Sequence, residues 1–182
     1  MLTIISIIIL GTAFYAGYRR GLALQIVYFL GYTLSFMAAK HFYKSVGKKI
    51  ELFVPYPAPT PKTHFTIMDN ALVFDLDKAF YASFGFILVL FVGYLLTKFV
   101  GMLCYRLTFT FLLKKGNSLA GALVNTFVTY IGLVLVLTML SMIPLDFIQS
   151  AFKSSSLASF MVEKTPFLSS DLHRWWITDI IK

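Results

Sequence analysis

The chain has 182 residues, a normal length for one domain, but 58% of them are hydrophobic and only 13% are charged. So few charged side chains cannot coat the surface of a water-soluble domain, and the composition excludes that class. The net charge is +8, yet the bases are scattered between apolar segments and are not interleaved with aromatic residues on one basic surface. We therefore expect an integral membrane protein without a nucleic-acid partner.

Four segments free of charged side chains are long enough to cross a bilayer. A helix needs about 20 mostly apolar residues to span about 30 Å of hydrocarbon. The predicted spans are 2–18, 21–39, 79–97 and 119–143. The sequence thus predicts an all-α integral membrane protein, with a single membrane domain over residues 1–182 and four transmembrane helices.

Two arginines interrupt the apolar sequence between the first two spans, in the stretch GYRRGLALQI. A cleavable signal peptide carries its positive charge before its apolar segment, so we expect the first span to be retained as a membrane anchor. The neighbouring glycines permit a tight reversal, and the arginines can contact lipid phosphates. We interpret Arg19, Arg20 and Gly21 as the cytoplasmic elbow of a helical hairpin.

The predicted outer loop, 40–78, contains prolines at positions 55, 57, 59 and 61. This spacing predicts a stiff, extended spacer. From Phe65 to Phe80 apolar residues recur at helical intervals, including Met68, Leu72 and Leu76, and this predicts an amphipathic lead-in to the third span. Asp75 and Asp77 have no further ligands at a calcium-binding spacing, so we expect them on a solvated face.

Charge predicts the orientation of the chain. The connector between spans one and two and the inner connector, 98–118, together carry six bases and no acid: Arg19, Arg20, Lys98, Arg106, Lys114 and Lys115. The outer loop and the tail mix lysines with acids, although Lys40, Lys44, Lys48 and Lys49 weaken the contrast. By the positive-inside rule both short connectors are cytoplasmic, and the N- and C-termini are outside.

The tail, 144–182, contains no further crossing. Its apolar residues predict amphipathic helices lying on the outer membrane surface, and we expect Trp175 and Trp176 at headgroup depth. The residues predicted to line that apolar face are Phe147, Ile148, Phe152, Leu157, Phe160 and Met161.

Small and polar residues form a seam along each of spans two to four. Such residues in a membrane helix indicate either close helix packing or a polar path for a solute, and Asn125 and Thr129 are the best candidates to line such a path. The seam residues are Gly31 and Ser35, then Gly93, Thr97 and Gly101, then Gly121, Asn125, Thr129 and Gly132.

Residues for catalysis are sparse. No charged side chain lies deep in a span, which disfavours a proton-coupled pump. Ser154 to Ser156 with Asp171 and His173 are the best hydrolase candidates, but no nucleophile-elbow motif accompanies them. The single cysteine, Cys104, has no metal partner nearby. We predict a protein that is not an enzyme and uses no cofactor or metal.

Three stretches resemble the colicin V production protein family in the form found in Gram-positive bacteria: GYRRGLALQIVYFLGYTLSFMAA, KKGNSLAGALVNTF and SSLASFMVEKTPFLS. The most specific feature is the pair Arg20 and Gly21. Many relatives have an acid shortly after this pair, where this chain has Gln25. Many also have a second glycine one turn after the position of Gly121, where this chain has Asn125.

The resemblance implies a multi-pass protein of the bacterial cell membrane, involved in toxin or bacteriocin production or export and in envelope homeostasis. We therefore expect a non-enzymatic accessory or scaffold factor. Its expected partners are anionic lipid headgroups and envelope or export proteins, and self-association is an open alternative. The alternative function is a small oligomeric channel or transporter subunit built around the small-residue seams.

Overall fold

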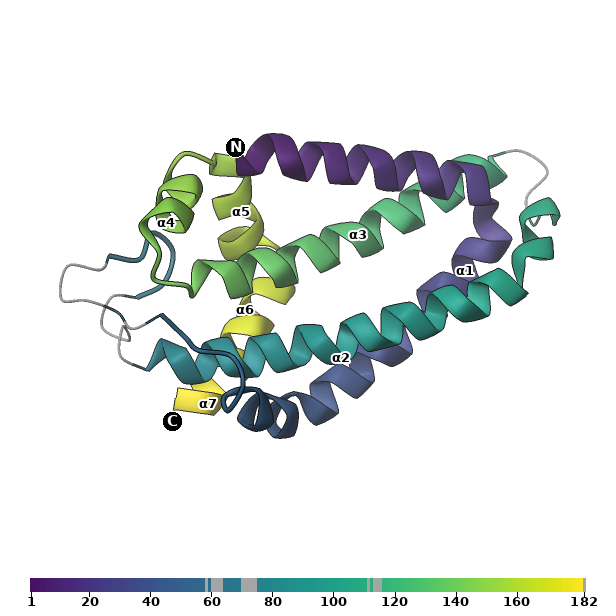
Figure 1. Cartoon of the computed structure of the whole chain (residues 1–182). Helices are drawn as coiled ribbons and strands as arrows, with labels where there is room; N and C mark the ends of the chain where they lie inside the picture. The colour runs from purple at the N-terminus through teal and green to yellow at the C-terminus, as the bar shows by residue number, and fades with distance from the viewer. Residues whose placement is uncertain (58, 60–63, 70–74, 111, 113–115, 182) are drawn as a thin grey trace. The chain divides into compact units, whose positions relative to one another are not determined.

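The computed structural model describes residues 1–57, 59, 64–69, 75–110, 112 and 116–181, and Figure 1 shows the course of the chain. The described residues form helices and no strand, as the sequence predicted. Several residues used above lie outside the described part. These are Pro61 of the spacer, Leu72 of the lead-in, and Lys114 and Lys115 of the inner connector.

Three helices in the described part are long and apolar enough to cross a membrane. They are α1 (Leu2–Ile50), α2 (Leu76–Leu103) and α3 (Asn117–Ser141). The sequence predicted two separate helices at 2–18 and 21–39, and both segments fall within α1. The expected count of four is therefore replaced by three helices, the first of which is broken.

The break in α1 lies at Gly21, whose backbone has φ 71° and ψ 175°. A side chain makes this conformation costly, so essentially only glycine adopts it. In Figure 1 the ribbon of α1 turns sharply between its purple first arm, 2–20, and its blue second arm, 22–50. One glycine thus separates two helical arms.

The loops and connectors are shorter than predicted. Because α1 continues to Ile50 and α2 begins at Leu76, the segment predicted to be the outer loop covers 51–75 and not 40–78. We keep the name outer segment for 51–75, although its side of the membrane stays a prediction. Residues 66–68 form a bend and not the expected lead-in helix, since the backbone N–H of Thr66 donates to Gln149 Oε1 at 3.0 Å. Beyond Lys98, α2 runs on to Leu103, and a 3₁₀ helix, η2 (Tyr105–Phe109), follows.

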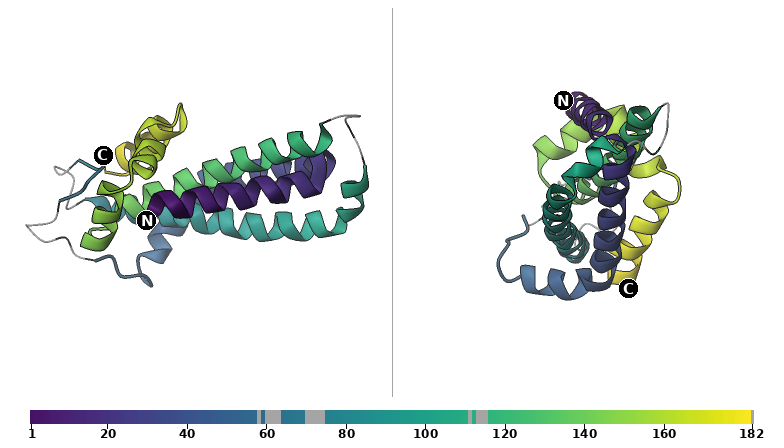
Figure 2. Two further views of the ribbon diagram at one scale, coloured as in Figure 1. Left: turned by 90° about the horizontal axis from the view of Figure 1, so that it is seen from above. Right: turned by 90° about the vertical axis from the view of Figure 1, so that its right-hand side faces the viewer.

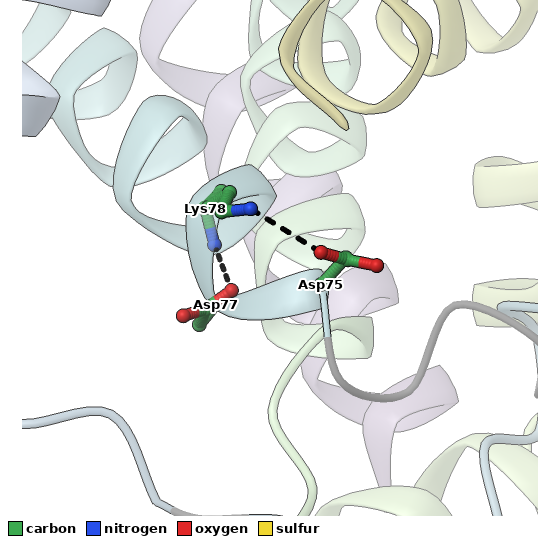
Figure 3. Close-up of polar contacts among 3 residues, drawn as sticks. All are labelled: Asp75, Asp77 and Lys78. Atoms are coloured by element: carbon green, nitrogen blue, oxygen red, sulfur yellow. Dashed lines mark hydrogen bonds and ion pairs between the residues drawn. The ribbon is translucent and has the colours of Figure 1, made fainter. Parts of the chain in front are cut away.

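Asp75 and Asp77 lie at the start of α2 beside Lys78, as Figure 3 shows. The Lys78 ammonium contacts Asp75 Oδ1 at 3.3 Å, and the Lys78 backbone N–H donates to Asp77 Oδ1 at 2.7 Å. An acid in the first turn suits the positive end of the helix dipole. These two carboxylates therefore have a structural role at the start of α2.

The chain divides into two compact units. We call residues 7–41 and 88–132 the bundle unit, and residues 1–6, 42–87 and 133–182 the tail unit. In the bundle unit the two arms of α1 run side by side with the adjoining parts of α2 and α3, as Figure 1 and Figure 2 both show. The unit is thus an antiparallel helical bundle.

The bundle unit has small and polar residues inside and large apolar residues outside. Its buried residues include Ala13, Gln25, Ser35, Thr97 and Asn125. Its exposed residues include Ile8, Leu34, Phe91, Leu96 and Phe127. Lipid tails are as apolar as leucine, so membrane helices meet through small and polar side chains.

The tail unit contains four short helices and a π-helix: α4 (Asp146–Lys153), α5 (Ser156–Lys164), α6 (Leu168–Leu172), η3 (His173–Thr178) and α7 (Asp179–Ile181). Trp176 is fully buried and meets Phe86 edge-on, with ring centroids 5.5 Å apart. Phe152 and Met161 are buried too. The prediction of a membrane-surface position is therefore wrong for Trp176, Phe152 and Met161, which belong to the core of this unit. Phe147 and Phe160 of the predicted face are exposed, and their contact with a membrane stays a prediction.

Tyr56 helps to hold the outer segment within the tail unit. Its hydroxyl donates to the carbonyl of Met142 at 2.6 Å, and its backbone N–H donates to the hydroxyl of Tyr81 at 3.1 Å. Burial raises the pKa of the Tyr56 hydroxyl, and the negative charge of Asp77 raises it further. The hydroxyl therefore keeps its proton and remains a donor.

Candidate functional site

At the Gly21 end of the bundle unit, helix backbones approach one another closely at three glycines. A Cβ added to Gly17 would lie 2.5 Å from the carbonyl oxygen of Gly121, and one added to Gly121 would lie 2.7 Å from the carbonyl carbon of Gly21. A Cβ on Gly21 would also lie 2.6 Å from Asn117 Nδ2. Both arms of α1 therefore contact the first turns of α3, and only glycine fits there.

Asn125 joins the two arms of α1 by hydrogen bonds. Its Nδ2 donates to the carbonyl of Ala13 at 2.6 Å, and its Oδ1 accepts from Gln25 Nε2 at 3.1 Å. Gln25 is fully buried, and its Oε1 has no hydrogen-bond partner among the described residues. The two positions at which the family resemblance leads one to expect an acid and a glycine thus form one buried amide pair.

Small and hydroxyl-bearing residues also join the second arm of α1 to α2. Gly31 faces Thr97, and Gly93 faces Ser35. The Thr97 and Ser35 hydroxyls donate within their own helices, to the carbonyls of Gly93 and Gly31, each at 2.7 Å. Both hydroxyls thus have a hydrogen-bond partner in their own helix at the contact between the two helices.

A cluster of bases and tyrosines lies at the same end of the bundle unit. The guanidinium carbon of Arg20 and the ammonium nitrogen of Lys98 both lie 4.9 Å from the ring centroid of Tyr28. Lys98 also lies 5.1 Å from the centroid of Tyr94, and Tyr32 stacks between Tyr28 and Tyr94. These are cation–π distances. We call these five residues the basic–aromatic cluster.

The structure brings together most of the predicted site residues but not all. Arg20, Gly21, Gly121 and Asn125 lie at the elbow, while Arg19 is exposed. A Cβ on Gly132 would meet nothing within 4 Å, so this glycine is outside the packed seam. Thr129 is half-buried. Whether any of these residues contacts lipid or lines a path stays a prediction.

Sequence reasoning missed the tyrosines of the cluster and counted Lys98 only as a charge. One available signal was the spacing of four residues between Tyr28 and Tyr32 and between Tyr94 and Lys98, which places each pair on one helix face. No spacing in the sequence shows that the two faces meet.

The residues weighed as hydrolase candidates have other partners in the structure. Asp171 Oδ1 contacts Arg174 at 2.7 Å, and Ser155 caps α5 while its hydroxyl bonds to Thr3 at 2.8 Å. His173 lines a pocket of the tail unit, with Ser169, Ser170 and Glu163. Within the described ranges, no group of three His, Cys, Asp or Glu residues could hold a metal ion.

These features define a multi-pass, all-helical membrane protein with a small-residue interior. The family model described as colicin V production protein matches residues 2–166, so the chain belongs to that family. It is also similar to "Uncharacterized transmembrane protein YshB" of Bacillus subtilis (strain 168), with 29% identity over 179 residues and 97% of each chain covered. No solved structure matches significantly.

Proposed function

We propose that this chain is a non-enzymatic scaffold or accessory factor of the cell membrane, acting in toxin or bacteriocin production or export and in envelope homeostasis. The bundle unit anchors it, and the tail unit binds an envelope or export protein. Family membership supports the process. We further propose four crossings, with the arms of α1 as the first two and both termini outside the cell.

The observation that best supports a binding role is the conformation of Phe167 in the tail unit, which is both exposed and strained. Its side chain is 87% exposed, and its backbone φ is 63°, a conformation that is rare for a bulky residue. Strained, exposed residues cluster at functional sites, because folding alone does not favour them. Phe53 and Phe147 of the same unit are also largely exposed.

The alternative, a channel subunit, is less well supported. A solute path past Asn125 would compete with its hydrogen bonds to Ala13 and Gln25. The glycine contacts at Gly17 and Gly121 also leave no room for a side chain, let alone for a solute. We therefore favour the scaffold.

The test is site-specific crosslinking in living cells. A photoreactive amino acid in place of Phe167 should capture one defined protein, whereas the same probe in place of Leu34, a 67% exposed residue of the bundle unit, should capture lipid only. Crosslinks from position 167 to lipid alone would contradict the scaffold role.

A substitution separates binding from folding. Phe167→Gly relieves the backbone strain, so the variant should be as stable as the parent or more stable by about 1 kcal/mol, and yet lose the captured partner. Loss of the partner together with loss of the folded protein would instead point to a structural role for Phe167.

A further inference from the structure

The basic–aromatic cluster carries positive charge without a matching acid. In the described part of the chain, neither Arg20 nor Lys98 makes a hydrogen bond or an ion pair. The residue ranges of the bundle unit contain no Asp or Glu at all. Among the described residues, these two charges lie against tyrosine rings, and a ring offers no formal negative charge.

The two cations lie close together. Each is 4.9 Å from the same ring centroid, so they are separated by less than about 10 Å, the screening length at 0.1 M salt. Both side chains are half-buried, where screening is weaker than at an open surface. Two like charges in this setting repel each other, and an anion between them would remove the repulsion.

The donors of the cluster suit a phosphate group. A guanidinium can bind two phosphate oxygens at once, and an ammonium supplies a compact charge. Tyr94 is 42% exposed and its hydroxyl makes no hydrogen bond within the described residues, so it is available as a further donor. A carboxylate ligand would use fewer of these donors.

The surroundings favour a lipid as the source of the phosphate. Leu95 and Phe99, on either side of Lys98 along α2, are large, apolar and exposed, and so is Phe29 next to Tyr28. Acyl chains can cover such side chains, while a soluble anion would leave them against water. Arg19 is exposed too, but no ring of the described residues contacts it.

We propose that Arg20 and Lys98, framed by Tyr28 and Tyr94, form a saturable binding site for the phosphate group of an anionic phospholipid. The sequence predicted that Arg19 and Arg20 both contact lipid phosphates. The proposed site keeps Arg20, leaves out Arg19 and adds Lys98 from α2. It stands independently of the scaffold role, because it requires no partner protein.

The experiment is native mass spectrometry of the full chain released from nanodiscs that contain equal amounts of phosphatidylglycerol and phosphatidylcholine. The parent protein should retain one phosphatidylglycerol with about tenfold preference. Arg20→Gln and Lys98→Gln should each reduce this retention about tenfold, since each removes a charged donor. Lys98→Arg keeps the charge and should therefore retain phosphatidylglycerol as the parent protein does.

Arg19→Gln is the matched control, because it removes the same charge one residue away. It should leave retention unchanged. Equal losses in Arg19→Gln and Arg20→Gln would mean diffuse attraction to the membrane and would overturn the site, as would equal retention of the two lipids by the parent protein. If inorganic phosphate at millimolar concentration displaces the lipid, the assignment to a lipid phosphate is wrong.

Folding is monitored separately by thermal unfolding of each variant in detergent. Should Arg20→Gln unfold, Lys98→Gln decides the question, because this position is on α2 and not at the break in α1. A folded Lys98→Gln variant with unchanged lipid retention would overturn the proposal.

Discussion

At the scale of single residues, Gly21 has the most direct effect on the fold. Its backbone conformation ends one helical arm and begins the next, and the absence of a side chain lets Asn117 and Gly121 approach. Both requirements act at one position, and no other residue type meets either without strain.

Gly21→Ala should destabilise the protein by about 2–3 kcal/mol, because it adds backbone strain and a clash with Asn117. The thermal unfolding midpoint in detergent measures the effect. Gly11→Ala is the control, since this glycine of the same helix has open space for a Cβ. It should be neutral or stabilising by up to about 1 kcal/mol. Equal effects of the two substitutions would contradict the role of Gly21.

The buried amide pair is a second prediction at this scale. Gln25→Ala and Asn125→Ala should show a coupling of about 0.5–1.5 kcal/mol in a double-mutant cycle, because each amide loses its partner. Pairing Gln25→Ala with Thr126→Ala should give no coupling, since the Thr126 hydroxyl bonds only to Ala122 within its own helix. Additive effects of the two substitutions would show that the hydrogen bond between Gln25 and Asn125 does not contribute to stability.

At the scale of elements, Gln149 of α4 connects three segments of the tail unit. Its Nε2 donates to the carbonyls of Ser141 and Ile143 at the end of α3, at 3.1 and 2.8 Å. Its Oε1 and its own carbonyl accept from Thr66. The last carbonyls of a helix lack partners within it, so this side chain completes the end of α3 and also holds the outer segment.

Gln149→Leu should therefore loosen residues 64–69 while α3 stays helical. We expect faster amide hydrogen exchange in that segment and a loss of about 2 kcal/mol in stability, because buried carbonyls and the Thr66 N–H lose their partner. Ser150→Ala, next to it but exposed, should change neither quantity. Unchanged exchange at residues 64–69 in the Gln149 variant would refute this connection.

At the scale of the whole molecule, charge is divided between the two units. The residue ranges of the bundle unit contain seven of the 16 bases and none of the eight acids, and those of the tail unit contain the other bases and all the acids. Arg20 and Lys98 meet at the end of the bundle unit that contains the elbow. The positive-inside rule then predicts that this end faces the cytoplasm.

The native Cys104 tests this orientation. It follows α2 directly and is partly accessible, so a membrane-impermeant maleimide should label it only after the cells are permeabilised. In a Cys104→Ser background, Phe53→Cys should be labelled on intact cells, because Phe53 is 82% exposed in the outer segment. Labelling of Cys104 on intact cells would reverse the topology.

The sequence alone determined the all-α class, the apolar segments and the family. Each depends on local features: charge-free segments of bilayer length, the Arg20–Gly21 pair, and matches spread along residues 2–166. Helix ends were predicted less well. For example, α1 continues through Lys40, Lys44, Lys48 and Lys49, because lysine is a good helix former even where it marks the end of an apolar segment.

Only the tertiary structure decided which polar residues meet. Gln25 and Asn125 are 100 residues apart in the chain, and Trp176 was indistinguishable from a membrane-surface tryptophan until it was found buried against Phe86. The pairing of Arg20 and Lys98 over Tyr28 is of the same kind. Periodicity tells which face of a helix a residue occupies, but the partner of that face depends on how distant helices pack.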